Sequence, residues 1–329
     1  MSNKDIFYHL FFVLSASFFV ILVVFLYLNF TSTFIRPDDT VSYEKEDPVS
    51  LEMAFVGDIM MDRGVRNIAD KHGGYGYITK YLDFLKDFEI VFGNLEGPVS
   101  DKGMDVGGIY SFRMDPLVLD HLSDYNFSVL SVANNHAGDW GLDAFSDTLN
   151  RLDAYGISSV GGGFDLKDAK EVSVIKIEDF KVGFLGFTDI GPDWLEADDK
   201  NPGILLSRSD YHDVLIEKSA KEVDLLVVSY HFGKEYMKEP SERQRFLATK
   251  AIDLGADLVI GHHPHVIQPI EEYNNGVIVY SLGNFIFDQY FSKETMEGLV
   301  FTVLVKDGEM SYESKKVDLT DHFQPKLRE

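Results

Sequence analysis

The sequence predicts an α/β fold in which strands and helices alternate along the chain. Short apolar runs typical of buried strands alternate with segments of helical periodicity. Several of these runs end in polar side chains, and ligands of α/β folds bind at that end of the strands. Strand pairs joined by short turns add antiparallel hairpins, which indicate a mixed sheet or two sheets stacked between helices.

Each element is predicted from its own pattern. Apolar runs predict strands at residues 51–57, 89–93, 127–133, 223–230 and 257–261. Helical periodicity predicts helices at residues 75–87, 115–125, 141–154 and 241–254. Turn residues such as Asn274-Asn275-Gly276 and Asp307-Gly308 predict hairpins that pair 171–178 with 181–188, 266–272 with 277–282, and 298–306 with 309–317.

The N-terminal region predicts a membrane anchor outside the folded domain. No charged residue occurs from Ile6 to Ile35, and this run exceeds the ~20 residues that a helix needs to cross a bilayer. A cleaved signal peptide is the alternative, but the apolar block exceeds the usual ~7–15 residues and no small-x-small cleavage site follows it. We therefore expect an anchor at residues 1–35, an acidic linker at 36–50 and one domain at 51–329.

The charges that flank the anchor favour one orientation only slightly. Lys4 lies on the short N-terminal side, and Arg36 and Lys45 lie on the other side among acidic residues, which count for little in the positive-inside rule. We expect a single-pass protein of the cell membrane whose globular domain is extracytoplasmic.

Composition excludes some classes of partner and site. The net charge of −24 disfavours nucleic acid as a partner. The chain contains no cysteine, so disulfides and thiolate metal sites are excluded and any metal must be held by oxygen and nitrogen ligands. With 329 residues, 45% of them apolar, the chain can bury a substantial core.

Metal-competent side chains follow five predicted strands. The densest motif is Gly261-His262-His263-Pro264-His265, directly after a predicted buried strand. Carboxylate, amide and imidazole groups together suit one or two divalent cations, such as Mn, Fe or Zn. The expected metal ligands are Asp58, Asn94, Glu96, Asn135, His231, His263 and His265. We expect Asp58 and His136 to be catalytic, with His136 donating a proton to the leaving group.

Each of these residues also has a purely structural explanation. Asp58 could cap a turn, and an asparagine pair could hold a tight loop. Glu96 could form a salt bridge with an arginine, and His231 could be a core histidine. Five such coincidences in one chain favour a metal cleft.

Six motifs then occur in order along the chain: Gly57-Asp58-Ile59-Met60-Met61-Asp62-Arg63, Gly93-Asn94-Leu95-Glu96-Gly97, Ala133-Asn134-Asn135-His136-Ala137-Gly138-Asp139, His231-Phe232-Gly233-Lys234-Glu235-Tyr236, Gly261-His262-His263-Pro264-His265 and Tyr280-Ser281-Leu282-Gly283-Asn284-Phe285. Over about residues 51–290 the chain resembles the bacterial capsule-synthesis CapA family, the membrane-anchored proteins of poly-γ-glutamate capsule assembly. That family is similar to the calcineurin-like metallophosphoesterases, which implies a four-layer α/β/β/α sandwich with a two-metal centre at the strand ends.

The resemblance also implies a role for each matched residue. Asp58 matches the first aspartate, Asn94 or Glu96 the bridging carboxylate, Asn135 the amide ligand and His136 the proton donor; His231, His263 and His265 match the histidine ligands. Two departures stand out. Met60 replaces the histidine of the phosphoesterase Asp-x-His motif, and the bridging aspartate is replaced by the segment with Asn94 and Glu96. These departures leave a single-metal site or a different reaction open.

The function expected from these features is metal-dependent hydrolysis or transfer during poly-γ-glutamate capsule synthesis or export. Arg63, Arg113 and Lys234 are the candidates for binding an anionic substrate, although surface charge is the alternative for each. The expected partners are the polymer or its intermediate, the membrane and other capsule-synthesis membrane subunits. A non-catalytic polymer-binding subunit and a general cell-envelope phosphoesterase are the competing hypotheses.

Overall fold

The computed structural model describes residues 12, 19–27 and 50–328. Most of the expected anchor and linker therefore lies outside the described residues, although residues 19–27 are helical. None of the helices in the described part of the chain is both long and apolar enough to cross a membrane. Val49–Glu329 forms one compact unit, which contains the candidate site.

The compact unit contains two large β-sheets. In the larger sheet the strands follow the order β16 (Pro325–Leu327), β15 (Glu309–Leu319), β14 (Glu297–Lys306), β1 (Ser50–Ile59), β2 (Ile90–Leu95), β3 (Phe127–Ser131) and β4 (Ser158–Val160), and β13 (Asn284–Ile286) also pairs with β1. In the smaller sheet the order is β11 (Ile270–Tyr273), β12 (Gly276–Val279), β10 (Leu258–His262), β9 (Leu225–His231), β7 (Phe180–Thr188) and β6 (Ser173–Ile177). A short pair joins β5 (Gly162–Gly163) to β8 (Gly203–Ile204).

Both sheets are mixed, with parallel strands at the centre. β1, β2, β3 and β4 run parallel to one another, and so do β7, β9, β10 and β12. Antiparallel neighbours at the margins are β14, β15 and β16 in the larger sheet and β6 and β11 in the smaller. The carboxyl ends of the parallel strands therefore share one edge in each sheet.

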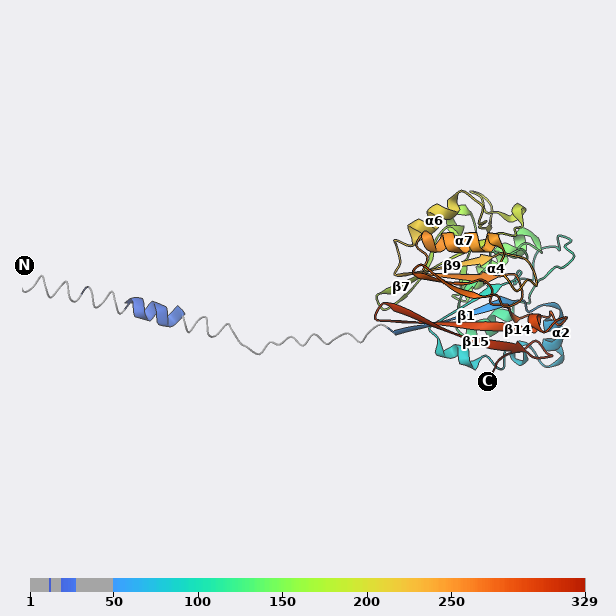
Figure 1. The fold of residues 1–329 in the computed structure, drawn as a ribbon, viewed down its shortest axis with the longest axis horizontal. Coiled ribbons are helices and arrows are strands. Elements are labelled where there is room, and N and C mark those ends of the chain that lie inside the picture. The colour runs from blue at the N-terminus through green and yellow to red at the C-terminus, as the bar shows by residue number, and fades with distance from the viewer. Residues whose placement is uncertain (1–11, 13–18, 28–49, 329) are drawn as a thin grey trace, which may run out of the picture. The chain divides into compact units, whose positions relative to one another are not determined.

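Helices cover the outer faces of the two sheets (Figure 1). The α-helices of the compact unit are α2 (Arg63–Lys71), α3 (Val118–Asp124), α4 (Gly141–Ala154), α5 (Leu166–Ala169), α6 (Tyr211–Ser219) and α7 (Glu242–Asp253). Short 3-10 turns lie at η1 (Tyr75–Tyr77), η2 (Asp83–Asp87), η3 (Asp193–Leu195) and η4 (Glu294–Met296).

The helices and sheets form four layers, and three large apolar clusters lie between these layers. One cluster joins the larger sheet to α2, α3 and α4, a second fills the space between the sheets, and a third joins the smaller sheet to α6 and α7. Successive side chains of β1 point to opposite faces of the sheet and so contribute to two of these clusters. Val56 faces the helices, whereas Met53 and Phe55 face the other sheet. The expected mixed α/β fold with two sheets stacked between helices is confirmed.

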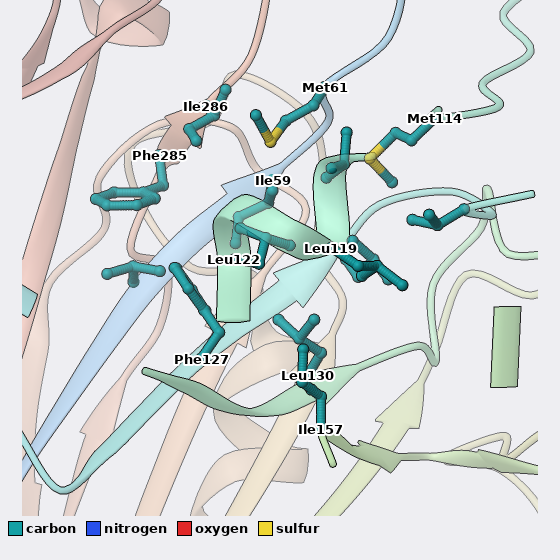
Figure 2. Packing of buried hydrophobic residues seen from close by; sticks show 14 of the residues in the cluster. Ile59, Met61, Met114, Leu119, Leu122, Phe127, Leu130, Ile157, Phe285 and Ile286 are labelled. Carbon is teal, nitrogen blue, oxygen red and sulfur yellow. The ribbon is translucent and has the colours of Figure 1, made fainter. Parts of the chain in front are cut away.

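Packing of the first cluster fixes the carboxyl end of β1, the strand that carries Asp58 (Figure 2). Ile59 packs there with Leu122 of α3, Leu130 of β3 and Phe285 of β13, and none of the four is exposed to solvent. Apolar cores are close-packed, so such neighbours hold the strand end in one position.

The prediction of a helix at residues 75–87 is wrong. The structure has the separate 3-10 turns η1 and η2 in this segment. Glycine lowers helix propensity, and Gly73 and Gly74 adopt φ of 91° and 114° immediately before it, with Gly76 inside it. Three helices were not predicted, α2, α5 and α6. In α2 the buried pair is Val65 and Ala69, a spacing of four residues typical of a helix.

Candidate metal centre

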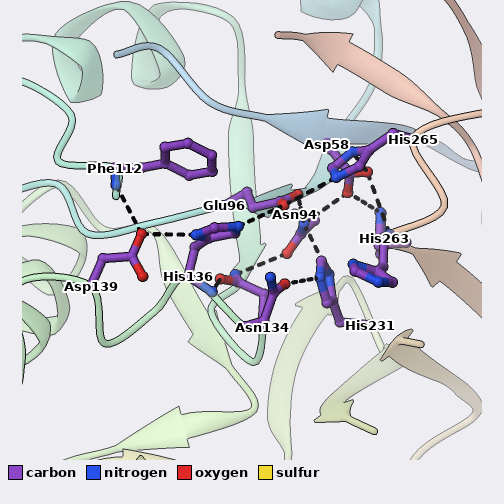
Figure 3. Close-up of polar contacts among 12 residues, drawn as sticks. Asp58, Asn94, Glu96, Phe112, Asn134, His136, Asp139, His231, His263 and His265 are labelled. Atoms are coloured by element: carbon purple, nitrogen blue, oxygen red, sulfur yellow. Dashed lines mark hydrogen bonds and ion pairs between the residues drawn. The ribbon is translucent and has the colours of Figure 1, made fainter. Parts of the chain in front are cut away.

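The candidate site lies where the carboxyl ends of the parallel strands of both sheets meet (Figure 3). In the larger sheet Asp58 of β1 lies beside Asn94 of β2. In the smaller sheet His231 of β9 lies beside His262 of β10. The two sheets come together at this edge, because Asn94 Nδ2 lies 3.4 Å from His231 Nδ1.

Backbone constraints bring these residues together. A Cβ on Gly57 would lie 1.9 Å from the carbonyl oxygen of Gly283, so only glycine allows β13 to approach β1 this closely. The Asp58 amide donates to the same oxygen at 3.0 Å. His263 and His265 adopt φ of 95° and 57°, in a region that such side chains rarely occupy. Strained backbone of this kind concentrates at functional sites.

Asp58 and Glu96 form a buried acidic pair. Neither residue is exposed to solvent. The Asn94 side-chain amide holds both, since Nδ2 donates to Asp58 Oδ1 at 2.8 Å and to Glu96 Oε2 at 3.2 Å. Asn134 in turn donates from Nδ2 to Asn94 Oδ1 at 3.2 Å and to the Leu95 carbonyl at 2.8 Å. In this arrangement Asn94 orients the two carboxyl groups.

His265 bridges the same two carboxyl groups. Its Nδ1 lies 3.1 Å from Asp58 Oδ2 and its Nε2 lies 3.4 Å from Glu96 Oε1. Nδ1 also lies 3.0 Å from Asn284 Oδ1. One donor atom each of Asp58, Glu96 and His265 lies within 4.8 Å of the others, and we call these three residues the inner triad.

Burial and mutual electrostatic interactions shift the pKa values of all three residues of the inner triad. Burial raises the pKa of Glu96 well above its usual value, with a further contribution from the charge of Asp58. Burial would also raise the pKa of Asp58, but His262 and His265 hold that pKa well below the usual value. Burial would lower the pKa of His265, whereas Glu96 and Asp58 raise it to about 9.

The remaining expected histidine ligands are neutral. Burial, with the nearby His265, lowers the pKa of His263 to about 3. Burial, with the nearby His263, lowers the pKa of His231 well below its usual value. Metal ions bind neutral imidazole. His231 Nε2 lies 2.6 Å from Asn135 Oδ1, so these two potential ligands contact each other.

The donor set fits a divalent cation. Glu96 Oε1 and His263 Nδ1 are buried and have no hydrogen-bond partner among the described residues. Buried polar atoms are usually hydrogen-bonded, and an unsatisfied one calls for a specific explanation. Carboxylate with imidazole and without thiolate suits Mn, Fe or Zn.

His136 lies at the edge of this centre, and its ring contacts the carboxylate of Asp139. Its Nδ1 lies 2.8 Å from Asp139 Oδ2, and its Nε2 lies 4.0 Å from Glu96 Oε1. Asp139 Oδ2 also accepts the amide of Phe112 at 2.8 Å, which fixes the carboxylate. A carboxylate on Nδ1 selects the tautomer and orientation of the ring and leaves Nε2 directed at the site. No role is predicted for Asp139 from the sequence, although it follows His136 by three residues in the same motif.

A pocket with a volume of about 180 Å³ opens beside the inner triad and is lined by His136, His265, Arg63 and several aromatic side chains. Arg63 forms an ion pair with Asp288. Arg113 stacks on Trp140, with its guanidinium carbon 3.5 Å from the ring centroid, and it does not line the pocket. Lys234 is exposed and also lies outside the pocket lining. Of the three expected substrate-binding residues, the structure brings Arg63 alone to this pocket.

The structure therefore brings every expected metal ligand and His136 into one network. It adds residues that the sequence analysis did not select: Asn134, Asp139, Glu235, His262, Asn284 and Asp288. Five of these stand in the same short motifs, and the exception is Asp288. Proximity in the sequence to a predicted ligand was the available signal.

Comparison with known proteins gives one family. Residues 52–289 match the family described as "Bacterial capsule synthesis protein PGA_cap". The chain is similar to the "PGA biosynthesis protein CapA" of Bacillus subtilis (strain 168), with 36% identity over 278 residues, covering 82% of this chain and 72% of that protein.

One solved structure with low sequence identity shares the fold, and a second one is less similar. A hypothetical protein from Thermus thermophilus has a TM-score of 0.51 and 15% identity, covering 81% of this chain and 99% of the other. The calcineurin-like phosphoesterase YfkN from Bacillus subtilis has a TM-score of 0.46 and 13% identity, covering 82% and 90%.

Proposed function

Because the chain belongs to the bacterial capsule synthesis protein family, we propose that it is a divalent-metal-dependent hydrolase or transferase of capsule biosynthesis. The substrate class is poly-γ-glutamate or a lipid- or phosphate-linked intermediate of that polymer. Similarity to the PGA biosynthesis protein CapA of Bacillus subtilis supports the polymer. The buried centre described above supports the metal dependence.

The observation that carries this proposal is the inner triad. Two carboxyl groups and an imidazole converge within 4.8 Å at a position without solvent exposure of either acid, and Glu96 Oε1 has no hydrogen-bond partner there. Asp58, Glu96 and His265 would hold the cation. When bound, a divalent cation supplies Lewis acidity and lowers the pKa of a coordinated water.

The residues around the triad have distinct roles in the proposed reaction. His136 donates a proton from Nε2 to the leaving group, and Asp139 holds the ring in position. Arg63 lines the pocket and orients an anionic substrate. His231, His263 and Asn135 are further ligand candidates beside the triad.

One observation favours a non-catalytic alternative. Met60, which stands where the phosphoesterase motif has a histidine, has no exposed surface and packs with Phe112 and Phe287. With methionine in place of histidine, one metal ligand of that motif is missing, so the centre departs from that of a phosphoesterase. A chain of net charge −24 repels polyglutamate, so a subunit that only binds the polymer would need a bridging cation. Such a subunit would use the metal for binding and not for catalysis.

Metal analysis and an activity screen test the proposal together. Full-length protein stripped with chelator and reloaded with Mn, Fe or Zn is expected to retain at least one tightly bound cation. Glu96→Gln keeps the size of the side chain, and it should lower the affinity at least ~10-fold because a ligand carboxylate is lost.

The loaded protein is then assayed on phosphomonoesters, phosphodiesters and γ-glutamyl polymer. Turnover that requires the metal establishes the enzyme and its substrate class. Tight cation binding without turnover on any of the three would support the polymer-binding subunit instead, and no cation binding at all would refute the metal centre.

A further inference from the structure

A second pocket, with a volume of about 270 Å³, is lined largely by basic side chains. We call it the basic pocket, and its lining residues are Lys238, Val266, Ile267, Lys293, Glu294, Glu297 and Lys316. Three lysines and two glutamates line it, whereas acidic residues outnumber lysine and arginine by 54 to 30 in the whole chain. The pocket beside the inner triad, which we call the metal-site pocket, has Arg63 against Glu235 and Asp288. The basic pocket is therefore a local exception to the acidic character of the chain.

Three segments of the chain line both pockets. Each segment contributes residues to the metal-site pocket and, a few positions further on, to the basic pocket: Glu235 and Tyr236 with Lys238, His265 with Val266 and Ile267, and Gln289 and Phe291 with Lys293 and Glu294. Two residues span at most about 7 Å of extended chain. The two pockets are therefore neighbours along all three segments, and an extended ligand of several units can reach from one into the other.

Asn284 links the candidate metal ligand His265 to a wall of the basic pocket. Asn284 is not exposed to solvent, and its Oδ1 lies 3.0 Å from His265 Nδ1. Its Nδ2 donates to the Thr295 carbonyl at 2.9 Å. Thr295 belongs to η4, which follows Lys293 directly. This buried side chain therefore fixes the segment of Lys293 relative to the metal centre.

The segment that carries Lys238 is attached to both neighbouring segments. The Tyr236 amide donates to the Pro264 carbonyl at 2.8 Å, in the histidine motif. Lys238 Nζ lies 2.7 Å from Glu294 Oε1 of η4. Lys238 is therefore held on the side of the basic pocket that adjoins the metal-site pocket.

Glu297 gathers three cations at the basic pocket. Its carboxylate lies 3.4 Å from Lys293 Nζ, 3.3 Å from Lys316 Nζ and 3.0 Å from Arg328 Nη2. Burial would raise the pKa of Glu297, but Arg328, Lys316 and Lys293 hold that pKa below its usual value. One ionised carboxylate cannot balance three cations.

The ion pairs around the basic pocket leave one positive charge in excess. Lys238 and Lys293 have 64% and 82% of their side chains exposed. Ion pairs of exposed side chains contribute little, so a carboxylate of a ligand can replace or share them at small cost. The group comprises four basic and three acidic side chains: Lys238, Lys293, Lys316 and Arg328 with Glu294, Glu297 and Asp318.

We propose that the basic pocket binds carboxylate groups of an extended anionic polymer whose reacting unit occupies the metal-site pocket. The inference rests on the proposed function, because poly-γ-glutamate carries a carboxylate on every unit. Lysine binds a carboxylate as a point charge on a flexible stem, which suits repeated negative groups in varying positions. The excess positive charge also offsets, at this place, the repulsion of a polyanion by a chain of net charge −24. A short substrate fills the metal-site pocket without reaching the lysines.

Binding of a γ-glutamyl dimer and a γ-glutamyl decamer to full-length protein tests this subsite, with fluorescence anisotropy as the readout. The unmodified protein should bind the decamer more tightly than the dimer. Combining Lys238→Gln with Lys293→Gln should weaken decamer binding at least ~3-fold and change dimer binding much less. At about 1 M salt the Debye length is about 3 Å, so the difference between the variant and the unmodified protein should disappear.

Lys176→Gln combined with Lys218→Gln is the matched control. Both lysines are exposed, pair with a carboxylate and line neither of the two pockets. The control removes the same charge, so its affinity for the decamer should equal that of the unmodified protein. Equal weakening by both double variants would overturn the subsite, and so would a decamer that binds no more tightly than the dimer. Failure of the proposed function has a different signature, because the metal-loaded protein would then turn over neither oligomer while the length-dependent binding through Lys238 and Lys293 persists.

Discussion

At the scale of single residues, a substitution of His136 distinguishes the enzyme hypothesis from the hypothesis of a non-catalytic binding protein. It contacts Asp139 and lies 4.0 Å from Glu96 without belonging to the inner triad. Replacing His136 by Ala should leave metal content and the unfolding temperature nearly unchanged. Loss of a general acid should lower turnover by ~10²–10⁴-fold.

Asp139→Asn is the companion variant. It keeps the ring in place but weakens the bond to Nδ1, so the pH profile of turnover should shift while metal content stays constant. Loss of metal or of the folded state in His136→Ala would contradict the proton-donor role and make the residue structural.

The ligand residues could be predicted from the sequence because of a simple rule about strands. Parallel strands end at one edge of a sheet, so Asp58 and Asn94 were expected to meet in one sheet and His231 and His263 in the other. Which of these residues contact a cation depends on the conformation of the loops, such as the positive φ of His263. No sequence pattern predicted these loop conformations. Glu235 was missed for the same reason.

At the scale of elements, the segment after β2 is tied to α4 by one buried carboxylate. Asp147 on α4 accepts from Ser100 Oγ at 2.7 Å, from Lys102 Nζ at 2.7 Å and from Arg151 Nε at 2.7 Å. Burial would raise the pKa of Asp147, but these partners lower it to about 2. The carboxylate therefore stabilises the folded state as long as it is ionised.

Asp147→Asn should destabilise the protein by about 1–3 kcal/mol at neutral pH, because charge-assisted hydrogen bonds are lost. The difference should be complete above about pH 4, near the usual pKa of 3.8, and should vanish as the pH falls through about 2, where Asp147 is protonated in the folded state as well. Chemical denaturation between pH 2 and 7 measures it. Asp153→Asn, at an exposed position of the same helix, is the control, and an equal effect of both variants would contradict the assignment.

Strands were predicted more reliably than helices. The buried strands β1, β2, β9 and β10 follow continuous apolar runs, and hairpins such as β14–β15 follow their turn residues. The short helices α2 and α6 bury only a few side chains each, so their periodicity is brief. The segment 75–87 has apolar residues at helical spacing, but the glycines around its start break the helix.

At the scale of the whole molecule, the stacking of two sheets creates the site. Each sheet alone would carry only part of the ligand set: Asp58, Asn94 and Glu96 belong to one, and His231 and His263 to the other or to its loops. The apolar cluster between the sheets holds the two edges together. Substitutions that separate the layers should therefore impair the metal centre even when they lie far from it.

We propose that residues 1–35 form a retained membrane anchor. Ile6 to Ile35 contains no charged residue, and the net charge of −24 of the chain disfavours binding of the domain to anionic lipid. The full-length chain should therefore fractionate with membranes, and a variant without residues 1–35 should be released from them. Protease added outside intact cells from which the wall has been removed should digest the domain. A mature N-terminus beyond residue 30 would identify a cleaved signal peptide, and membrane retention of the truncated variant would place the lipid contact in the domain itself.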